Sequence, residues 1–133
     1  MNKLVLILIF ALFTSCSSCS SIHIGQDPVV VNAERTTQVA LDAFDAVEKI
    51  DLDGYASFKM VNPKAAAAER TFVNNLRAHQ YEWVTSARTA TKAYKNNRDA
   101  AHKATLDTAI IVLVTATREA NKYIMEIHSA AQP

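Results

Sequence analysis

The sequence has little glycine or proline, with two glycines and three prolines in 133 residues. So few glycines cannot supply the left-handed turn positions of a many-stranded barrel or sandwich, and they exclude a glycine-rich phosphate-binding loop. Half of the residues are apolar and a fifth are charged, which excludes a chain too polar to build a core. Alanine, the strongest helix former, occurs 22 times. We therefore expect one all-α domain.

The sequence also lacks the motifs of common catalytic and metal sites. It contains no G-x-S-x-G segment, which an α/β-hydrolase would need. His79 and Glu82 lie three residues apart, but di-iron bundles use the reverse order, Glu-x-x-His, twice, so we expect His79 to pack beside Trp83. We predict no catalysis, no metal or other cofactor and no small-molecule substrate. A net charge of only +1 also argues against binding to nucleic acid.

The N-terminal segment predicts export. A run of ten apolar residues, 4–13, follows Lys3 and precedes Cys16. A membrane-spanning helix needs about 20 apolar residues, so a cleaved secretory signal is favoured. The segment 12–16 (Leu-Phe-Thr-Ser-Cys) resembles the lipobox of bacterial lipoprotein precursors, in which a bulky apolar residue and small residues precede a cysteine that becomes lipid-modified. The resemblance implies removal of residues 1–15 and a diacylglycerol on the sulfur of Cys16.

Residues 16–28 are expected to form a flexible, lipid-anchored tether, because they are rich in serine, lack a helical period and end at Pro28. Cys16 and Cys19 spell C-x-x-C, but further ligands at zinc spacing are missing. We expect Cys19 to be an idle thiol, with pairing between chains or a second acyl group as alternatives. In the lipoprotein class, a residue other than aspartate after the lipidated cysteine implies outer-membrane sorting, and Ser17 stands there.

The remaining residues, 29–133, divide into three amphipathic segments. The first is predicted to be a helix over 31–50 that residues 51–55 interrupt. Asn62 and Pro63 mark the start of the second helix, since asparagine is a good N-cap and proline is tolerated at the first helical position. Residues 96–99 separate it from the third. Short connections favour an antiparallel three-helix bundle. The positions expected to face the core are Ala33, Val39, Ala40, Ala43, Phe44, Val47 and Ile50, then Phe72, Leu76, Gln80, Trp83, Ala87, Ala90 and Tyr94, and then Leu106, Ile110, Leu113, Thr117, Ala120, Ile124 and Ile127.

Charge is distributed unevenly along these segments. Residues 27–53 hold seven acidic and two basic side chains, whereas residues 54–103 hold nine basic and three acidic ones. One interpretation is that opposite charges fix which helices pack together. The alternative is a basic contact patch for anionic headgroups, envelope polysaccharide or an acidic protein. The residues of that patch would be Arg88, Lys92, Lys95, Arg98 and Lys103.

Two local features raise further hypotheses. Asp51, Asp53 and Gly54 partly match a calcium loop, but Lys49 and Met60 stand at its first and last ligand positions. We interpret the segment as the end of a helix with two solvated acids.

Residues 109–114 form a run of six apolar residues that covers every side of a helix. Either this is a central helix surrounded by neighbours, or a second apolar face contacts another copy, a partner protein or the membrane surface. The residues of that predicted apolar interface are Ile111, Val112, Val114 and Met125.

These features together predict a non-catalytic envelope lipoprotein on the periplasmic face of the outer membrane. It would act in a structural, binding or scaffold role, with the membrane and either an envelope protein or a second copy as partners. The alternative is a small regulator or inhibitor of an envelope enzyme or receptor, of the exclusion or immunity type. A third hypothesis, an unusual hydrolase, would require acids and histidines gathered in one cleft.

Overall fold

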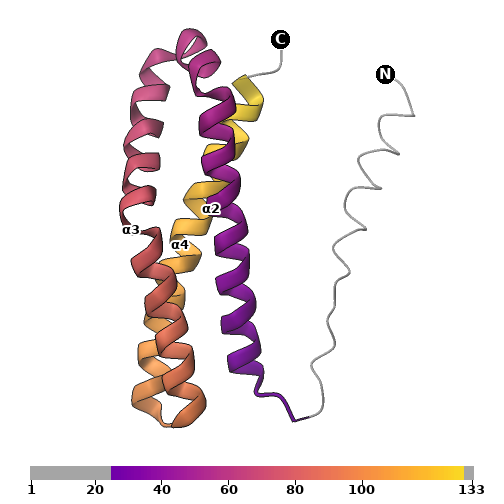
Figure 1. Ribbon diagram of the computed structural model, residues 1–133, viewed down its shortest axis with the longest axis vertical. Helices are drawn as coiled ribbons and strands as arrows, with labels where there is room; N and C mark the ends of the chain where they lie inside the picture. Colours follow the sequence, from indigo (N-terminus) through magenta and orange to yellow (C-terminus); the bar gives the residue numbers. More distant parts are fainter. Residues whose placement is uncertain (1–24, 131–133) are drawn as a thin grey trace, which may run out of the picture.

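Three long helices make up the part of the chain that the computed structural model describes, residues 25–130. They are α2 (Pro28–Val61), α3 (Pro63–Asn96) and α4 (Ala100–Ala130). The chain runs up α2, down α3 and up α4 (Figure 1), and each helix packs against the other two. The predicted all-α antiparallel three-helix bundle is confirmed. The predicted signal segment and the lipid-attachment cysteine lie outside the described residues.

The start of α2 differs from the prediction by three residues, because Pro28 is the first residue of the helix. Proline is tolerated there since its missing N–H would be unpaired at a helix start in any case. The side chain of Asp27 caps the helix, with Oδ1 accepting a hydrogen bond from the backbone N–H of Val29 at 2.9 Å. Pro28, which we expected to close the tether, therefore belongs to the bundle.

The two turns of the bundle are short, and in each a side chain caps the helix that follows. Asn62 alone joins α2 to α3, and its side-chain oxygen accepts a hydrogen bond from the backbone N–H of Ala65 at 3.2 Å. Pro63 is the first residue of α3, so the predicted start of the second helix is confirmed. At the other end, Asp99 Oδ1 accepts a hydrogen bond from the backbone N–H of His102 at 2.8 Å, which caps α4.

The predicted interruption of the first helix at residues 51–55 is wrong, since α2 continues through them to Val61. A glycine inside a helix costs only about 1 kcal/mol relative to alanine. Asp51 and Phe58, on either side of Gly54, are 4% and 5% exposed, and their contacts with the other helices outweigh that cost. Gly54 also lies against α4, where an added Cβ atom would meet Cγ2 of Ile127 at 3.5 Å.

The core runs along the bundle axis and receives one face of each helix. Fully buried alanines lie on all three helices, among them Ala40, Ala87 and Ala120, and such small side chains let helices approach closely. Larger side chains fill the space between them. The largest fully buried residues are Phe44, Val47, Val73, Leu76, Leu106, Leu113 and Tyr123.

Some predicted core positions are displaced by one residue or lie outside the core. On α3, Phe72 and Trp83 are only partly buried at the core edge, while the neighbouring Val73 and Val84 are 0% and 5% exposed. At these two positions of α3, the β-branched valine faces the core and the neighbouring ring packs at its edge. On α2, Val39 was expected in the core but is 56% exposed.

Replacing Leu76 by alanine should destabilise the fold, because its side chain is fully buried between the helices. We expect the free energy of unfolding to fall by about 2–5 kcal/mol, measured by urea denaturation with circular dichroism at 222 nm. Leu52→Ala is the matched control, since Leu52 is 79% exposed in a helix of equal length. Equal losses for the two variants would contradict the described core.

Candidate functional site

The five residues of the predicted basic patch lie near the end of the bundle where α2 begins and α3 turns into α4 (Figure 1). Three of them line a groove of about 340 Å³ between α2 and α3. We call it the basic groove. The residues that line it are Glu34, Thr37, Gln38, Arg88, Thr91, Lys92 and Lys95.

The other two basic residues of the patch lie outside the groove. Arg98 Nε pairs with Asp27 Oδ2 at 3.3 Å, beside the start of α2. Lys103 Nζ pairs with Asp107 Oδ2 at 2.6 Å, and the hydrogen bond to Asp107 raises the pKa of Lys103. Lys103 borders a separate hollow between α2 and α4. The structure therefore divides the predicted patch into a groove of three cations and two ion-paired neighbours.

Opposite charges meet between α2 and α3, as the first interpretation of the charge distribution predicted. Besides Arg98 and Asp27, Lys95 Nζ pairs with Glu34 Oε1 at 2.7 Å. The Lys95–Glu34 pair is exposed on both sides, and an exposed ion pair contributes about 0.2–1 kcal/mol, so it adds little to the stability of the bundle.

The four residues of the predicted apolar interface are all exposed, with Ile111 and Met125 at 64% and Val112 and Val114 at 40%. The interpretation of a central helix covered on every side is therefore wrong. Val114 and Met125 line a groove of about 550 Å³ between α2 and α4, with Val39 on the opposite wall. We call it the apolar groove. Val112 lies in a different groove, between α3 and α4.

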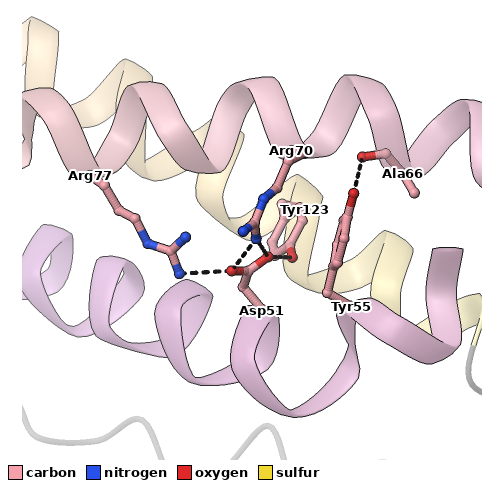
Figure 2. Close-up of polar contacts among 6 residues, drawn as sticks. All are labelled: Asp51, Tyr55, Ala66, Arg70, Arg77 and Tyr123. Carbon is pink, nitrogen blue, oxygen red and sulfur yellow. Dashed lines mark hydrogen bonds and ion pairs between the residues drawn. The ribbon is translucent and has the colours of Figure 1, made fainter.

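The strongest polar site was not predicted. The carboxylate of Asp51 lies between the three helices with 2% of its side chain exposed, and four hydrogen bonds reach it (Figure 2). Arg70 Nη1 donates to Oδ1 at 2.8 Å and to Oδ2 at 2.7 Å. Arg77 Nη2 donates to Oδ2 at 2.7 Å, and the hydroxyl of Tyr123 donates to Oδ1 at 3.4 Å. We call these four residues the Asp51 cluster.

The spacing of the two arginines explains why both reach one carboxylate. Arg70 and Arg77 are seven residues apart, which is about two turns, so they share a face of α3. The guanidinium of Arg70 also lies 4.8 Å from the centroid of the Tyr55 ring. Burial raises the pKa of Tyr123 to about 12, and the negative charge of Asp51 adds to this effect. The tyrosine hydroxyl is therefore protonated at neutral pH and remains a donor.

The Asp51 cluster is suited to holding helices together rather than to chemistry. Both carboxylate oxygens are occupied by donors, and among residues 25–130 no buried side-chain oxygen or nitrogen lacks a partner. A buried carboxylate is costly unless it is paired in this way. The sequence carried one signal of burial, since Asp51 continues the 3–4 spacing of Phe44 and Val47. The expectation that Asp51 is solvated is wrong.

Two carboxyl groups, Glu69 of α3 and Glu126 of α4, influence each other near the opposite end of the bundle from the basic groove. Burial raises the pKa of Glu69 to about 7, and a hydrogen bond with Glu126 and the negative charge of that residue add to the effect. Glu119 acts in the same direction, whereas the positive charge of Lys122 lowers the pKa. Two carboxyl groups can share a hydrogen bond only if one is protonated, so this contact weakens as the pH rises through neutrality.

The predicted packing of His79 beside Trp83 is confirmed. The rings of His79 and Trp83 are stacked with centroids 5.6 Å apart, as expected, and His79 Nδ1 lies 2.9 Å from the carbonyl oxygen of Asn75.

Within residues 25–130, no three histidine, cysteine, aspartate or glutamate side chains gather closely enough to hold a metal ion. None of the helices α2–α4 carries an apolar stretch long enough to cross a membrane.

Comparison with known protein families, with curated proteins and with solved structures finds no match to this chain.

Replacing Asp51 by asparagine should destabilise the bundle, because it leaves two arginines facing a buried site without a carboxylate. The arginine side chains are 41% and 33% exposed and can recover some hydration. We therefore expect a loss of about 2 kcal/mol, below the roughly 3–5 kcal/mol typical when a fully buried pair is broken. Urea denaturation measures it. Asp53→Asn, at an exposed position two residues away, should change stability by less than about 0.5 kcal/mol.

Replacing Glu69 by glutamine should remove a pH dependence of stability. The pKa of Glu69 is about 7 in the folded chain and near its ordinary value when unfolded. The folded state therefore binds the extra proton between these values, and its stability falls as the pH rises from about 4.5 to 7. In thermal melts from pH 4 to 8, Glu69→Gln should lack this part of the fall. Glu82→Gln, an exposed position on the same helix, should retain it. Parallel profiles for all three chains would contradict the assignment.

Proposed function

We propose that this chain is a non-catalytic lipoprotein of the bacterial cell envelope, anchored through Cys16 and acting through its helical surfaces as a binding or scaffold protein. The observation that carries the proposal is the position of Cys16 directly after an apolar run and two small residues. The periplasmic face of the outer membrane is the proposed location, because Ser17 follows the cysteine.

The bundle geometry supports the proposal in two respects. The described chain enters the bundle at Asp27 and Pro28, so an anchor at Cys16 would attach at the end that carries the basic groove. The polar cluster best shielded from solvent, around Asp51, has its oxygens occupied by neighbouring donors. The open features of the described surface are grooves between helices, which suit binding.

The alternative is a small regulator that blocks an envelope enzyme or receptor. The apolar groove favours it, since Val39 and Met125, which line this groove, are 56% and 64% exposed, and a helix or loop of a partner could cover them. This alternative predicts a tight one-to-one complex with one envelope protein. A scaffold would instead associate with itself or with lipid and cell wall.

Lipid attachment can be tested by expressing the full chain in Gram-negative cells with labelled palmitate. We expect the wild-type chain to incorporate label, to lose residues 1–15 and to partition into the detergent phase. Cys16→Ser should remain unlabelled and unprocessed, whereas Cys19→Ser, the matched control three residues away, should behave as wild type. An intact Met1 or a free thiol at Cys16 in the purified wild-type protein would refute the proposal.

A further inference from the structure

The basic groove has the composition of an anion-binding site. Arg88, Lys92 and Lys95 are spaced four and three residues apart, so they follow one face of α3. They line a groove of about 340 Å³ that also contains a single carboxylate, Glu34. Three cations against one anion leave the groove with an excess of positive charge.

The groove's free donors come from α3. The hydroxyls of Thr37 and Thr91 donate to carbonyl oxygens of their own helices at 2.8 Å, so they contribute acceptors and a polar wall. Lys95 is held by Glu34 at 2.7 Å. Arg88 and Lys92 are exposed and have no carboxylate within ion-pairing distance in the part of the chain that the structure describes. These two side chains are therefore available to bind an anion.

The groove lies at the positive end of the bundle. Residues 25–38 and 88–107, which form this end, hold six basic and four acidic side chains, while the other described residues hold seven basic and nine acidic ones. Two helices begin here and one ends (Figure 1), and helix N-termini carry partial positive charge. Arg88 is eight residues before the end of α3, about 12 Å along the helix axis.

We propose that the basic groove binds the phosphate of an anionic phospholipid headgroup, so that the bundle stands with the end that carries its anchor on the bilayer. The proposal rests on the proposed lipid anchor, which keeps this end near the membrane. Residues 16–27 span at most about 40 Å when extended, so headgroups stay at a high local concentration beside the groove. Guanidinium and ammonium groups are the usual partners of phosphate oxygens.

The test uses the mature, lipidated protein reconstituted into vesicles of neutral phosphatidylcholine, with and without anionic phosphatidylglycerol. Trp83 is the only tryptophan of the chain and lies on α3 five residues before Arg88, about 8 Å along the helix axis. Energy transfer from Trp83 to a dansyl-labelled lipid headgroup therefore reports how closely the bundle approaches the bilayer. We expect more transfer in the anionic vesicles and a return to the neutral level when salt is added.

The variant Arg88→Gln/Lys92→Gln should abolish the increase, because losing two basic residues at an anionic surface weakens docking about 30-fold. Lys59→Gln/Lys64→Gln is the matched control. It removes the same charge from exposed positions at the opposite end of the bundle and should retain the increase.

Two outcomes would overturn the inference: equal transfer in both kinds of vesicle, or equal loss of the increase in the two double variants. Equal transfer in both kinds of vesicle, together with binding of inorganic phosphate by the wild-type chain and not by Arg88→Gln/Lys92→Gln, would assign the groove to free phosphate. Cosedimentation of protein with both kinds of vesicle tests the anchor separately, so a failure of docking is distinguishable from a failure of lipidation.

Discussion

The arrangement of the bundle depends on one buried carboxylate. Asp51 of α2 receives hydrogen bonds from two arginines of α3 and from a tyrosine of α4 (Figure 2). Apolar side chains tolerate small shifts of one helix along another, since burial is not directional. A carboxylate with 2% of its surface exposed does not, because a shift that removed its donors would leave a buried charge unpaired. The cluster therefore fixes the positions of the three helices relative to one another along the bundle axis.

Weaker contacts follow the same alignment along the α2–α3 interface. Gln80 Nε2 donates to Glu48 Oε1 at 2.8 Å, one turn below the Asp51 cluster, and Lys95 pairs with Glu34 nearer the start of α2. These contacts have the order expected of antiparallel helices: partners with higher residue numbers in α2 pair with lower residue numbers in α3. With the helices aligned in this way, Arg88 and Lys92 line the same groove as Thr37 and Gln38 of the third turn of α2. The basic groove is thus a consequence of helix alignment.

The sequence predicts the helical fold well, because capping residues and the 3–4 spacing of apolar residues are local signals. Asn62 and Pro63 marked the first turn correctly. The Asp51 cluster could not be predicted in the same way, since its four members lie up to 72 residues apart and meet only in the folded bundle. Gly54 was misleading because the free-energy cost of a glycine inside a helix is smaller than the stabilisation that the surrounding tertiary contacts provide. Which apolar residues of 109–114 stay exposed depends on the number of neighbouring helices, which local periodicity does not encode.

The most direct test of this account is native-state amide hydrogen exchange in α2. If Asp51 is buried and paired within a continuous helix, the amides of residues 52–58 should exchange about as slowly as those of residues 40–47, in the core-facing middle of the same helix. Exchange in 52–58 as fast as in the turn at 97–99 would mean that the helix is broken there, and the carboxylate would then not be the fixed point of the bundle.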